Sequence, residues 1–226
     1  MAKSITKTLE IFLIYIDMLI IQRMFRKLRL FLENRRYKNL APGVSIGPNV
    51  NVSVKNNLVM KEGASLEPGT LIMNINAKFI MGRWSGAGPN LTVITGNHMS
   101  VVGKYLLQVN DNDKKIMDPE GRQDQDVIVE DDVWLGANVT LLNGVHIGRG
   151  AVIAAGAVCR TKIPPYSIVV GNPAKVIGFR FSPEEIIEHE TILYPEEERL
   201  PRALLERNYN KYYLNKLDSI NQYCKI

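Results

Sequence analysis

The sequence contains little of the material from which disulfide scaffolds, metal sites and membrane spans are built. Its two cysteines, Cys159 and Cys224, give neither a disulfide framework nor a metal-ligand spacing. Its three histidines occur without a CxxC or HExxH motif, which argues against a zinc site. The longest nearly apolar stretch, residues 9–21, is interrupted by Glu10 and Asp17 and is too short to cross a bilayer. It also lacks the features of a signal peptide, so the sequence favours a cytoplasmic protein.

Charge of one sign is not abundant either, but it is unevenly distributed. The formal net charge is +5, and residues 22–38 contribute seven Lys or Arg against one Glu. Residues 4–38 therefore predict one or two amphipathic helices with a basic face. Two roles stay open: packing on the rest of the protein or a neighbouring subunit, or peripheral contact with an anionic membrane surface. No nucleotide-phosphate motif is present, and we expect no nucleic-acid partner.

The middle of the chain repeats with a period of six. In residues 129–158, all ten first and fifth places of the hexads are apolar, which is a roughly one-in-two-thousand accident at 46% apolar composition. The fourth places hold Asp132, Asn138, Gly144, Gly150 and Gly156, which tolerate positive φ. Short strands separated by turns of about 120° would close a triangular coil, and stacked coils form a parallel β-helix. We predict first places inside and fourth places at corners.

Weaker hexads extend this pattern towards the N-terminus. Apolar first places continue from Ile46, with slips in the spacing at residues 54–59 and 76–80 that predict loops or bulges at corners. Residues 103–126 then break the pattern with a polar segment containing the turn former DPEG. A loop of this length within a compact repeat is usually functional.

The five hexads, followed by RTKIPPYSIVVGNPAKVIG, resemble the hexapeptide-repeat acyltransferases. The chain is most similar to their branch of galactoside, maltose and xenobiotic acetyltransferases and surface-polysaccharide O-acetyltransferases. The resemblance covers residues 44–180 and implies a mainly β fold, a left-handed parallel β-helix with an N-terminal helix and a C-terminal helical extension. We predict an N-terminal segment 1–40, a β-helix domain 41–180 with the extruded loop 103–126, and a helical tail 181–226. The tail should begin at Ser182, where Pro183 and Glu185 complete an N-cap signature.

The resemblance implies that His98, in TVITGNHMS just before the extruded loop, is the general base. This sequence has TGNH where the family has TGH, with one inserted residue. A neutral imidazole suits proton removal from a hydroxyl near pH 7, a step that contributes about 10²–10⁴-fold. No covalent acyl-enzyme is expected, because Cys159 has no local histidine partner. His146 is expected to face outward, and His189 receives no role.

The resemblance also implies residues for acceptor and donor. The acceptor-binding candidates are Asn74, Asn76 and Trp134. The donor would be acetyl-CoA, with no metal, and its predicted contacts are Gly136, Ala137, Ala155, Arg160, Lys162, Lys175 and Arg180. The small residues would let the pantetheine arm approach the backbone, and the Ala137 N–H would bind the thioester carbonyl. The four cations, which lie around the closing segment of the sequence, would bind the phosphates.

The resulting expectation is an acetyl-CoA-dependent O-acetyltransferase acting on a saccharide of a capsule, O-antigen or exopolysaccharide precursor. The resemblance implies a homotrimer with sites between neighbouring β-helices, and the basic segment 4–38 would suit a lipid-linked acceptor at the cytoplasmic membrane. Three alternatives remain: an amino-sugar N-acetyltransferase, a xenobiotic (antibiotic) acetyltransferase, and a non-catalytic β-helix scaffold.

Overall fold

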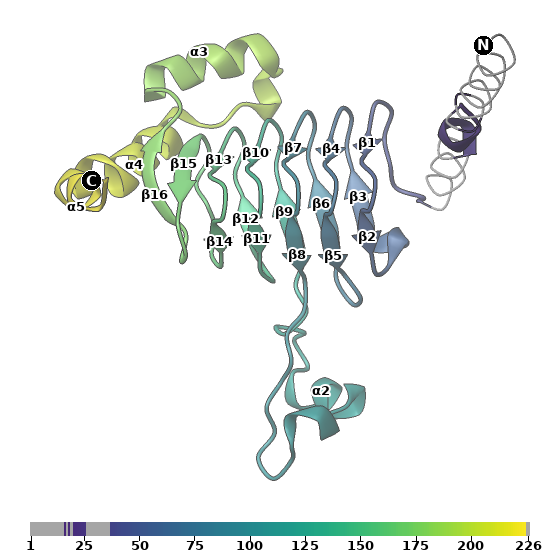
Figure 1. The fold of residues 1–226 in the computed structure, drawn as a ribbon. Coiled ribbons are helices and arrows are strands. Elements are labelled where there is room, and N and C mark those ends of the chain that lie inside the picture. The colour runs from purple at the N-terminus through teal and green to yellow at the C-terminus, as the bar shows by residue number, and fades with distance from the viewer. Residues whose placement is uncertain (1–15, 17, 19, 26–36, 225–226) are drawn as a thin grey trace, which may run out of the picture. The chain divides into compact units, whose positions relative to one another are not determined.

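A computed structural model describes residues 16, 18, 20–25 and 37–224, in two units, residues 1–38 and 39–226 (Figure 1). In the first unit, residues 16, 18 and 20–25 are helical, as the sequence predicts at these positions. The rest of the predicted amphipathic helix lies outside the described residues. Within the described part of the chain, no helix is long and apolar enough to cross a membrane.

The second unit contains a coil of short strands arranged in three sheets (Figure 1). The seven-stranded sheet contains β1 (Ser45–Ile46), β4 (Ser65–Leu66), β7 (Gly86–Ala87), β10 (Trp134–Leu135), β13 (Val152–Ile153), β15 (Ser167–Val170) and β16 (Lys175–Phe179). The five-stranded sheet contains β2 (Asn51–Val52), β5 (Leu71–Met73), β8 (Thr92–Ile94), β11 (Thr140–Leu141) and β14 (Val158–Cys159). The four-stranded sheet contains β3 (Leu58–Met60), β6 (Phe79–Met81), β9 (Val127–Val129) and β12 (His146–Ile147). The chain visits the sheets in rotation, so each strand pairs in parallel with the strand one coil away; among the described pairs only β15 and β16 are antiparallel.

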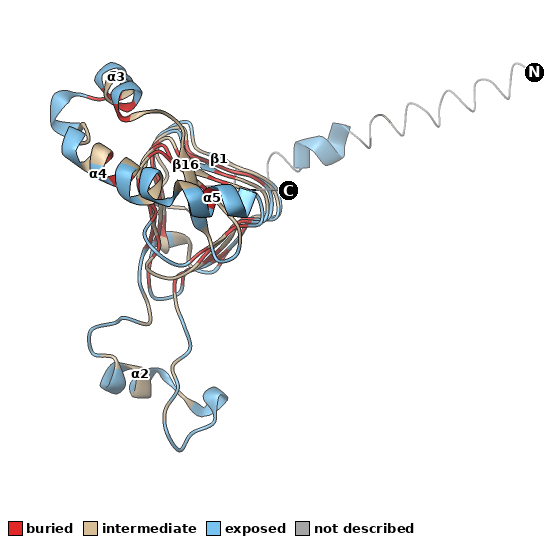
Figure 2. Cartoon of the chain, turned by 90° about the vertical axis from the view of Figure 1, so that its left-hand side faces the viewer, coloured by how far each residue is buried: buried red, intermediate tan, exposed pale blue. Residues whose placement is uncertain are grey.

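The inside of the coil is filled by the apolar places of the hexads. Leu66, Ala87, Leu135 and Ile153 stack in register along the seven-stranded sheet. All ten first- and fifth-place residues of 129–158 are at most 2% exposed. Figure 2 shows this buried lining within the coil. The predicted alternation is confirmed, and removal of these side chains from water stabilises the coil.

The corners of the coil carry residues with positive φ. The first corner, between the four- and seven-stranded sheets, has Gly43, Gly63, Trp84, Asp132, Gly150 and Tyr166 at φ between 55° and 73°. The second corner, between the seven- and five-stranded sheets, has Asn49, Gly69, Asn90, Asn138 and Gly156. All five predicted fourth-place residues of 129–158 have φ between 57° and 74°, so the prediction is confirmed. The third corner, between the five- and four-stranded sheets, contains the predicted slips, with the 3-10 helix η1 (Lys55–Asn57) in the first of them.

The long loop leaves the coil at the third corner, between β8 and β9, and projects away from it (Figure 1). It contains the 3-10 helix η2 (Leu106–Gln108) and helix α2 (Asp111–Met117). Asn110 caps α2, because its side chain accepts hydrogen bonds from the backbone N–H groups of Asn112 and Asp113. Helix α2 was not predicted from the sequence. The predicted loop starts at residue 103, whereas the last strand before it ends at residue 94.

The C-terminal extension is helical, with α3 (Pro183–Leu193), η3 (Glu196–Glu198), α4 (Arg202–Tyr212), η4 (Leu214–Lys216) and α5 (Leu217–Cys224). The predicted cap is confirmed, since the Ser182 hydroxyl accepts from the Glu185 N–H and the Glu185 side chain accepts from the Ser182 N–H.

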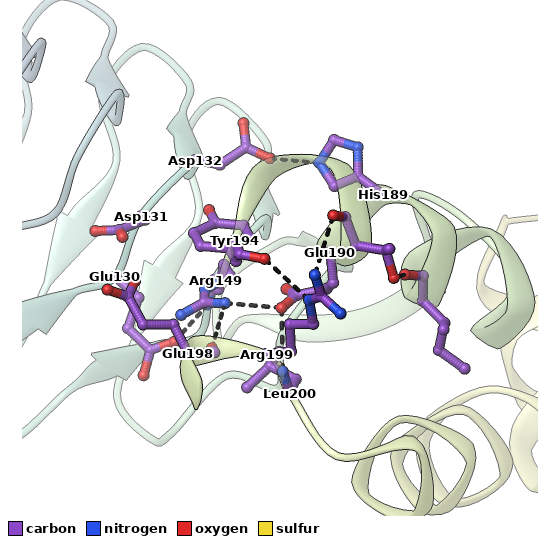
Figure 3. Close-up of polar contacts among 12 residues, drawn as sticks. Glu130, Asp131, Asp132, Arg149, His189, Glu190, Tyr194, Glu198, Arg199 and Leu200 are labelled. Carbon is purple, nitrogen blue, oxygen red and sulfur yellow. Dashed lines mark hydrogen bonds and ion pairs between the residues drawn. The ribbon is translucent and has the colours of Figure 1, made fainter. Parts of the chain in front are cut away.

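A buried polar network fastens α3 to the first corner of the coil (Figure 3). The Glu190 carboxylate accepts from the Tyr166 hydroxyl at 2.6 Å, from Arg149 Nη1 at 2.8 Å and from the Leu200 N–H at 3.0 Å. Three donors surround this carboxylate, as a buried charge requires.

Candidate active site

A cleft of about 410 Å³ opens at the third corner, beside the base of the long loop. One wall is apolar and includes Met73, Ile75 and Ile94. The polar lining includes His98 and Asn76 from the coil side and Asn110, Asp111, Lys114 and Asp124 from the loop. The cleft therefore offers an apolar surface beside hydrogen-bonding groups, as small-molecule sites do.

The base of the loop is held firmly just before His98. The Asn97 N–H donates to the Gln123 carbonyl at 2.8 Å, and the Gln125 N–H donates to the Thr95 carbonyl at 2.9 Å. A Cβ on Gly96 would lie 2.2 Å from Asp124 Oδ1, so a larger residue here would displace the Asp124 side chain. His98 in TGNH therefore follows directly after two chain segments that are hydrogen-bonded to each other.

The inserted residue of TGNH, Asn97, has its own anchor. Its Nδ2 donates to Asn143 Oδ1 at 2.9 Å on the next coil. His98, which follows, is exposed at the cleft and forms no hydrogen bond with any residue that the structure describes. Its ring nitrogens are therefore available to an incoming molecule.

Asp124 joins the cleft wall to the loop helix. Its Oδ2 accepts from Asn76 Nδ2 at 3.0 Å and from Lys114 Nζ, on α2, at 2.6 Å. Asp124 and Lys114 were not identified from the sequence, where the only signal was the polar character of the loop. Asn76 was identified, and it lies in the cleft with His98.

Asn74 differs from the expectation. It is fully buried, its Oδ1 accepts from the Val54 N–H and its Nδ2 donates to the Val54 carbonyl, both at 3.0 Å. Both ends of the amide therefore join adjacent coils, and Asn74 does not line the cleft. The role of Asn74 in acceptor binding therefore stays a prediction, and in one chain its amide serves the coil.

The second corner contains the small residues Gly136, Ala137 and Ala155. A Cβ on Gly136 would lie 2.6 Å from the Ala155 nitrogen, so glycine permits the close stacking of two coils. At this second corner, the residue before the positive-φ residue is proline in the first three coils (Pro48, Pro68 and Pro89). It is alanine in the next two coils (Ala137 and Ala155). Within the described residues, the N–H groups of these two alanines have no hydrogen-bond acceptor. They are free donors at positions where the other coils have none.

The four predicted phosphate-binding cations do not form one cluster. Arg160 and Lys162 are exposed where the chain leaves β14, and Lys175 begins β16 with its Nζ 5.0 Å from the Tyr223 ring centroid. Arg180 lies at the first corner, where its Nη1 pairs with Asp132 at 2.8 Å and donates to the Gly150 carbonyl at 3.1 Å. Arg180 is thus held at a different corner by Asp132, and the assignment of the four cations to the phosphates stays a prediction.

Within one chain, the candidates Trp134 and Ala137 lie away from the His98 cleft. Trp134 is exposed on the seven-stranded sheet and does not line the His98 cleft. His98 is at the third corner and Ala137 is at the second, with the five-stranded sheet between these corners.

The other chemically active side chains have structural environments. Cys159 stacks on Leu141 inside the coil, and burial raises the pKa of its thiol to about 12, which keeps it protonated. His146 faces outward, with its Nε2 2.5 Å from Glu130 Oε1. Among the described residues, no group of three or more His, Cys, Asp or Glu side chains could hold a metal ion.

Comparison with known proteins shows which protein family has the same repeat. Residues 126–161 match the model of the bacterial transferase hexapeptide family, described as six repeats. These residues are hexapeptide repeats of the bacterial transferase type.

The chain has curated and structural relatives. It is 51% identical over 61 residues, 27% of its length, to a "Probable macrolide acetyltransferase" of Lysinibacillus sphaericus, of which the match covers 34%. The chain thus spans about a third of the length of this relative. The structure resembles a hexapeptide-repeat acetyltransferase of Vibrio cholerae, solved with acetyl coenzyme A, with a TM-score of 0.55 and 21% identity over 68% of this chain and 77% of that one. It also resembles a maltose O-acetyltransferase of Clostridium difficile, with a TM-score of 0.52 and 22% identity over 63% and 70% of the two chains. The predicted left-handed parallel β-helix is confirmed.

Proposed function

We propose that this protein transfers the acetyl group of acetyl-CoA to a hydroxyl of a saccharide, such as a precursor of a capsule, O-antigen or exopolysaccharide. The observation that carries the proposal is the cleft at the base of the loop, where an unpartnered His98 lies beside Asn76. Amide groups next to an apolar wall suit a sugar, which presents hydroxyls on its edges and C–H groups on its faces.

His98 acts as the general base in this scheme. A ring nitrogen accepts the acceptor hydroxyl proton while the hydroxyl oxygen bonds to the thioester carbonyl carbon. The carbon–sulfur bond then breaks, and the imidazolium returns the proton to the departing thiolate. The Nδ2 group of Asn76 is held by Asp124, which leaves its Oδ1 to accept a hydrogen bond from the acceptor and orient it.

The second corner suits the donor. The thioester of acetyl-CoA supplies the activated acyl group, and the free N–H of Ala137 would donate to its carbonyl oxygen as negative charge develops there. The free N–H of Ala155 offers a further contact one coil away, beside Gly136. Arg160, Lys162 and Lys175 are the exposed cations that would meet the phosphates.

Since one chain separates His98 from Ala137 and Trp134, we propose that a second copy completes each site, in a homotrimer. The basic residues 22–38 would hold this assembly at an anionic membrane surface that carries a lipid-linked acceptor. Removal of residues 1–38 should then release the protein from vesicles containing phosphatidylglycerol, and equal co-sedimentation of both forms would contradict this contact.

The test of the activity uses purified full-length protein, acetyl-CoA and a panel of saccharides, with thiol release as the readout. We expect saccharide-dependent turnover that falls about 10²–10⁴-fold in His98→Ala, because the base is removed. A matching melting temperature shows that the variant folds. Undiminished turnover in His98→Ala would remove the imidazole from the mechanism.

A macrolide is the second candidate acceptor, and the relative from Lysinibacillus sphaericus favours it. A macrolide in the same panel separates the two proposals. His98-dependent turnover with the macrolide but with no saccharide would assign the chain to antibiotic modification.

A further inference from the structure

We propose that Asn143 is a positioning residue for the reaction, because it holds the chain segment that carries His98 against the coil. The inference rests on the proposed function, which takes His98 as the base. Asn143 lies at the third corner of the coil that follows the long loop, between β11 and β12. The outgoing segment of the loop base, residues 96–98, and the returning segment, residues 122–125, both contact this corner.

The side-chain amide of Asn143 reaches both segments of the loop base. Its Oδ1 accepts from Asn97 Nδ2 at 2.9 Å, and its Nδ2 donates to the Arg122 carbonyl at 3.4 Å. The next residue lies directly against the returning segment, since a Cβ on Gly144 would lie 2.1 Å from Gln125 Oε1. Asn143 and Gly144 together therefore form the surface of the coil on which the loop base lies.

The coil does not need the Asn143 amide in order to close. Strand β11 pairs with β8 and β14, and β12 pairs with β9, through the backbone. Among the described residues, the bond from Asn97 to Asn143 is the only hydrogen bond that joins residues 97–100 to the coil. The Asn97 N–H donates to the Gln123 carbonyl, which fixes the two segments to each other but not to the coil. The contact between the two amides therefore determines where His98 lies relative to the coil.

The other side of the loop base is held by the preceding coil, where Asn76 Nδ2 donates to Asp124 Oδ2 at 3.0 Å. The loop base is thus fixed between two coils, and His98 follows directly after it. A misplacement of about 1 Å between reacting groups can cost about 10²-fold in rate. Since Asn143→Ala removes one of two attachments, we expect a smaller loss, of about tenfold in kcat.

Steady-state kinetics of the full chain test this role, with acetyl-CoA and the saccharide of the panel that supports turnover. We expect Asn143→Ala to lower kcat about tenfold, with an unchanged KM for acetyl-CoA and an unchanged melting temperature. Asn143→Asp keeps an oxygen that accepts from Asn97 and should recover most of kcat. The control is Asn39→Ala, which removes an amide that donates to the Asn56 carbonyl at 2.8 Å, away from the His98 cleft. It should retain full activity.

A double variant separates positioning of the base from a general effect on the fold. If Asn143 acts through His98, Asn143→Ala should cause no further loss of the residual turnover of His98→Ala. A further tenfold loss in that background would contradict the inference, because the substitution would then impair the protein without acting on the imidazole. An undiminished kcat in Asn143→Ala would contradict it as well.

Proton NMR of the imidazole C2–H signals tests the placement without any substrate. The chain has three histidines, and the His98 signal is the one absent from His98→Ala. Asn143→Ala should move this signal and leave that of His189, on α3, in place, whereas Asn39→Ala should move neither. An unmoved His98 signal in Asn143→Ala would overturn the inference and leave the proposed function standing. A moved signal in a protein without His98-dependent turnover would support the positioning and contradict the proposed function.

Discussion

Asn74 and Asn76 are two positions apart, but their side-chain amides lie in different environments. The Asn74 amide satisfies the N–H and the carbonyl of Val54 inside the coil, whereas the Asn76 amide lies in the cleft and bonds to Asp124. The residue pattern MNINA identifies both as candidates, but spacing alone does not show which amide is already hydrogen-bonded. Only the position of the neighbouring coil, twenty residues earlier, decides it.

The pair gives a matched test at the residue scale. Asn74→Ala leaves two part-buried backbone groups of Val54 without their partner, so we expect the free energy of unfolding to fall by about 1–3 kcal/mol. Asn76→Ala should leave the melting temperature nearly unchanged and lower kcat/KM, because it removes an orienting contact with the acceptor. Chemical denaturation and steady-state kinetics distinguish the two. The assignment would be wrong if Asn74→Ala were fully stable and inactive.

At the scale of elements, the buried network around Glu190 fastens the helical extension to the coil. Glu190 has a 2% exposed side chain and pairs with Arg149, which is 13% exposed. Replacement of Glu190 by leucine leaves the arginine charge buried and unpaired, so we expect a loss of about 3–5 kcal/mol. Limited proteolysis should then cleave α3–α5 before the coil. Equal resistance to protease in both proteins would show that the extension is held elsewhere.

Tyr166 should make the stability of the contact between the helical extension and the coil depend on pH. Burial, and then the hydrogen bond to Glu190, raise the pKa of its phenol well above the ordinary 10.0. A raised pKa means that the contribution to stability is complete below about pH 10 and is lost as the pH rises above it, where the unfolded chain ionises first. We expect Tyr166→Phe to be less stable than the wild type by about 1 kcal/mol at pH 7. The difference in melting temperature should shrink above pH 10, and a constant difference would contradict the network.

The elements were unequally predictable from the sequence. The sixfold spacing predicts the strands, corners and interior, because each hexad place maps to one environment in every coil. Helix α2 was missed, since five of its seven residues are polar and it relies on the Asn110 cap and on the Lys114–Asp124 pair rather than on an apolar face. Trp84 at a corner was also missed, because a tryptophan does not signal positive φ.

At the scale of the whole molecule, the candidate site is divided. His98, the free N–H of Ala137 and the exposed Trp134 lie on different sides of one coil, and sequence position alone gave no indication of this separation. The resemblance predicted the residues and the need for a second copy, while the structure supplies the physical reason: a filled coil cannot bring its own corners together. The proposed active site therefore needs two chains.

Complementation between two inactive variants is the most direct test of this central claim. Ala137→Pro removes one N–H at a position where Pro48, Pro68 and Pro89 occupy the equivalent corners, so the coil should tolerate it. We expect Ala137→Pro to lose about 10²–10³-fold in kcat, and His98→Ala to be similarly impaired. Co-expressed as mixed assemblies, the two variants should recover about a quarter of the wild-type activity per site, because random mixing in a closed ring joins an intact His98 to an intact Ala137 at that frequency. Mixed assemblies that form, remain folded and show no recovery would contradict a site shared between chains.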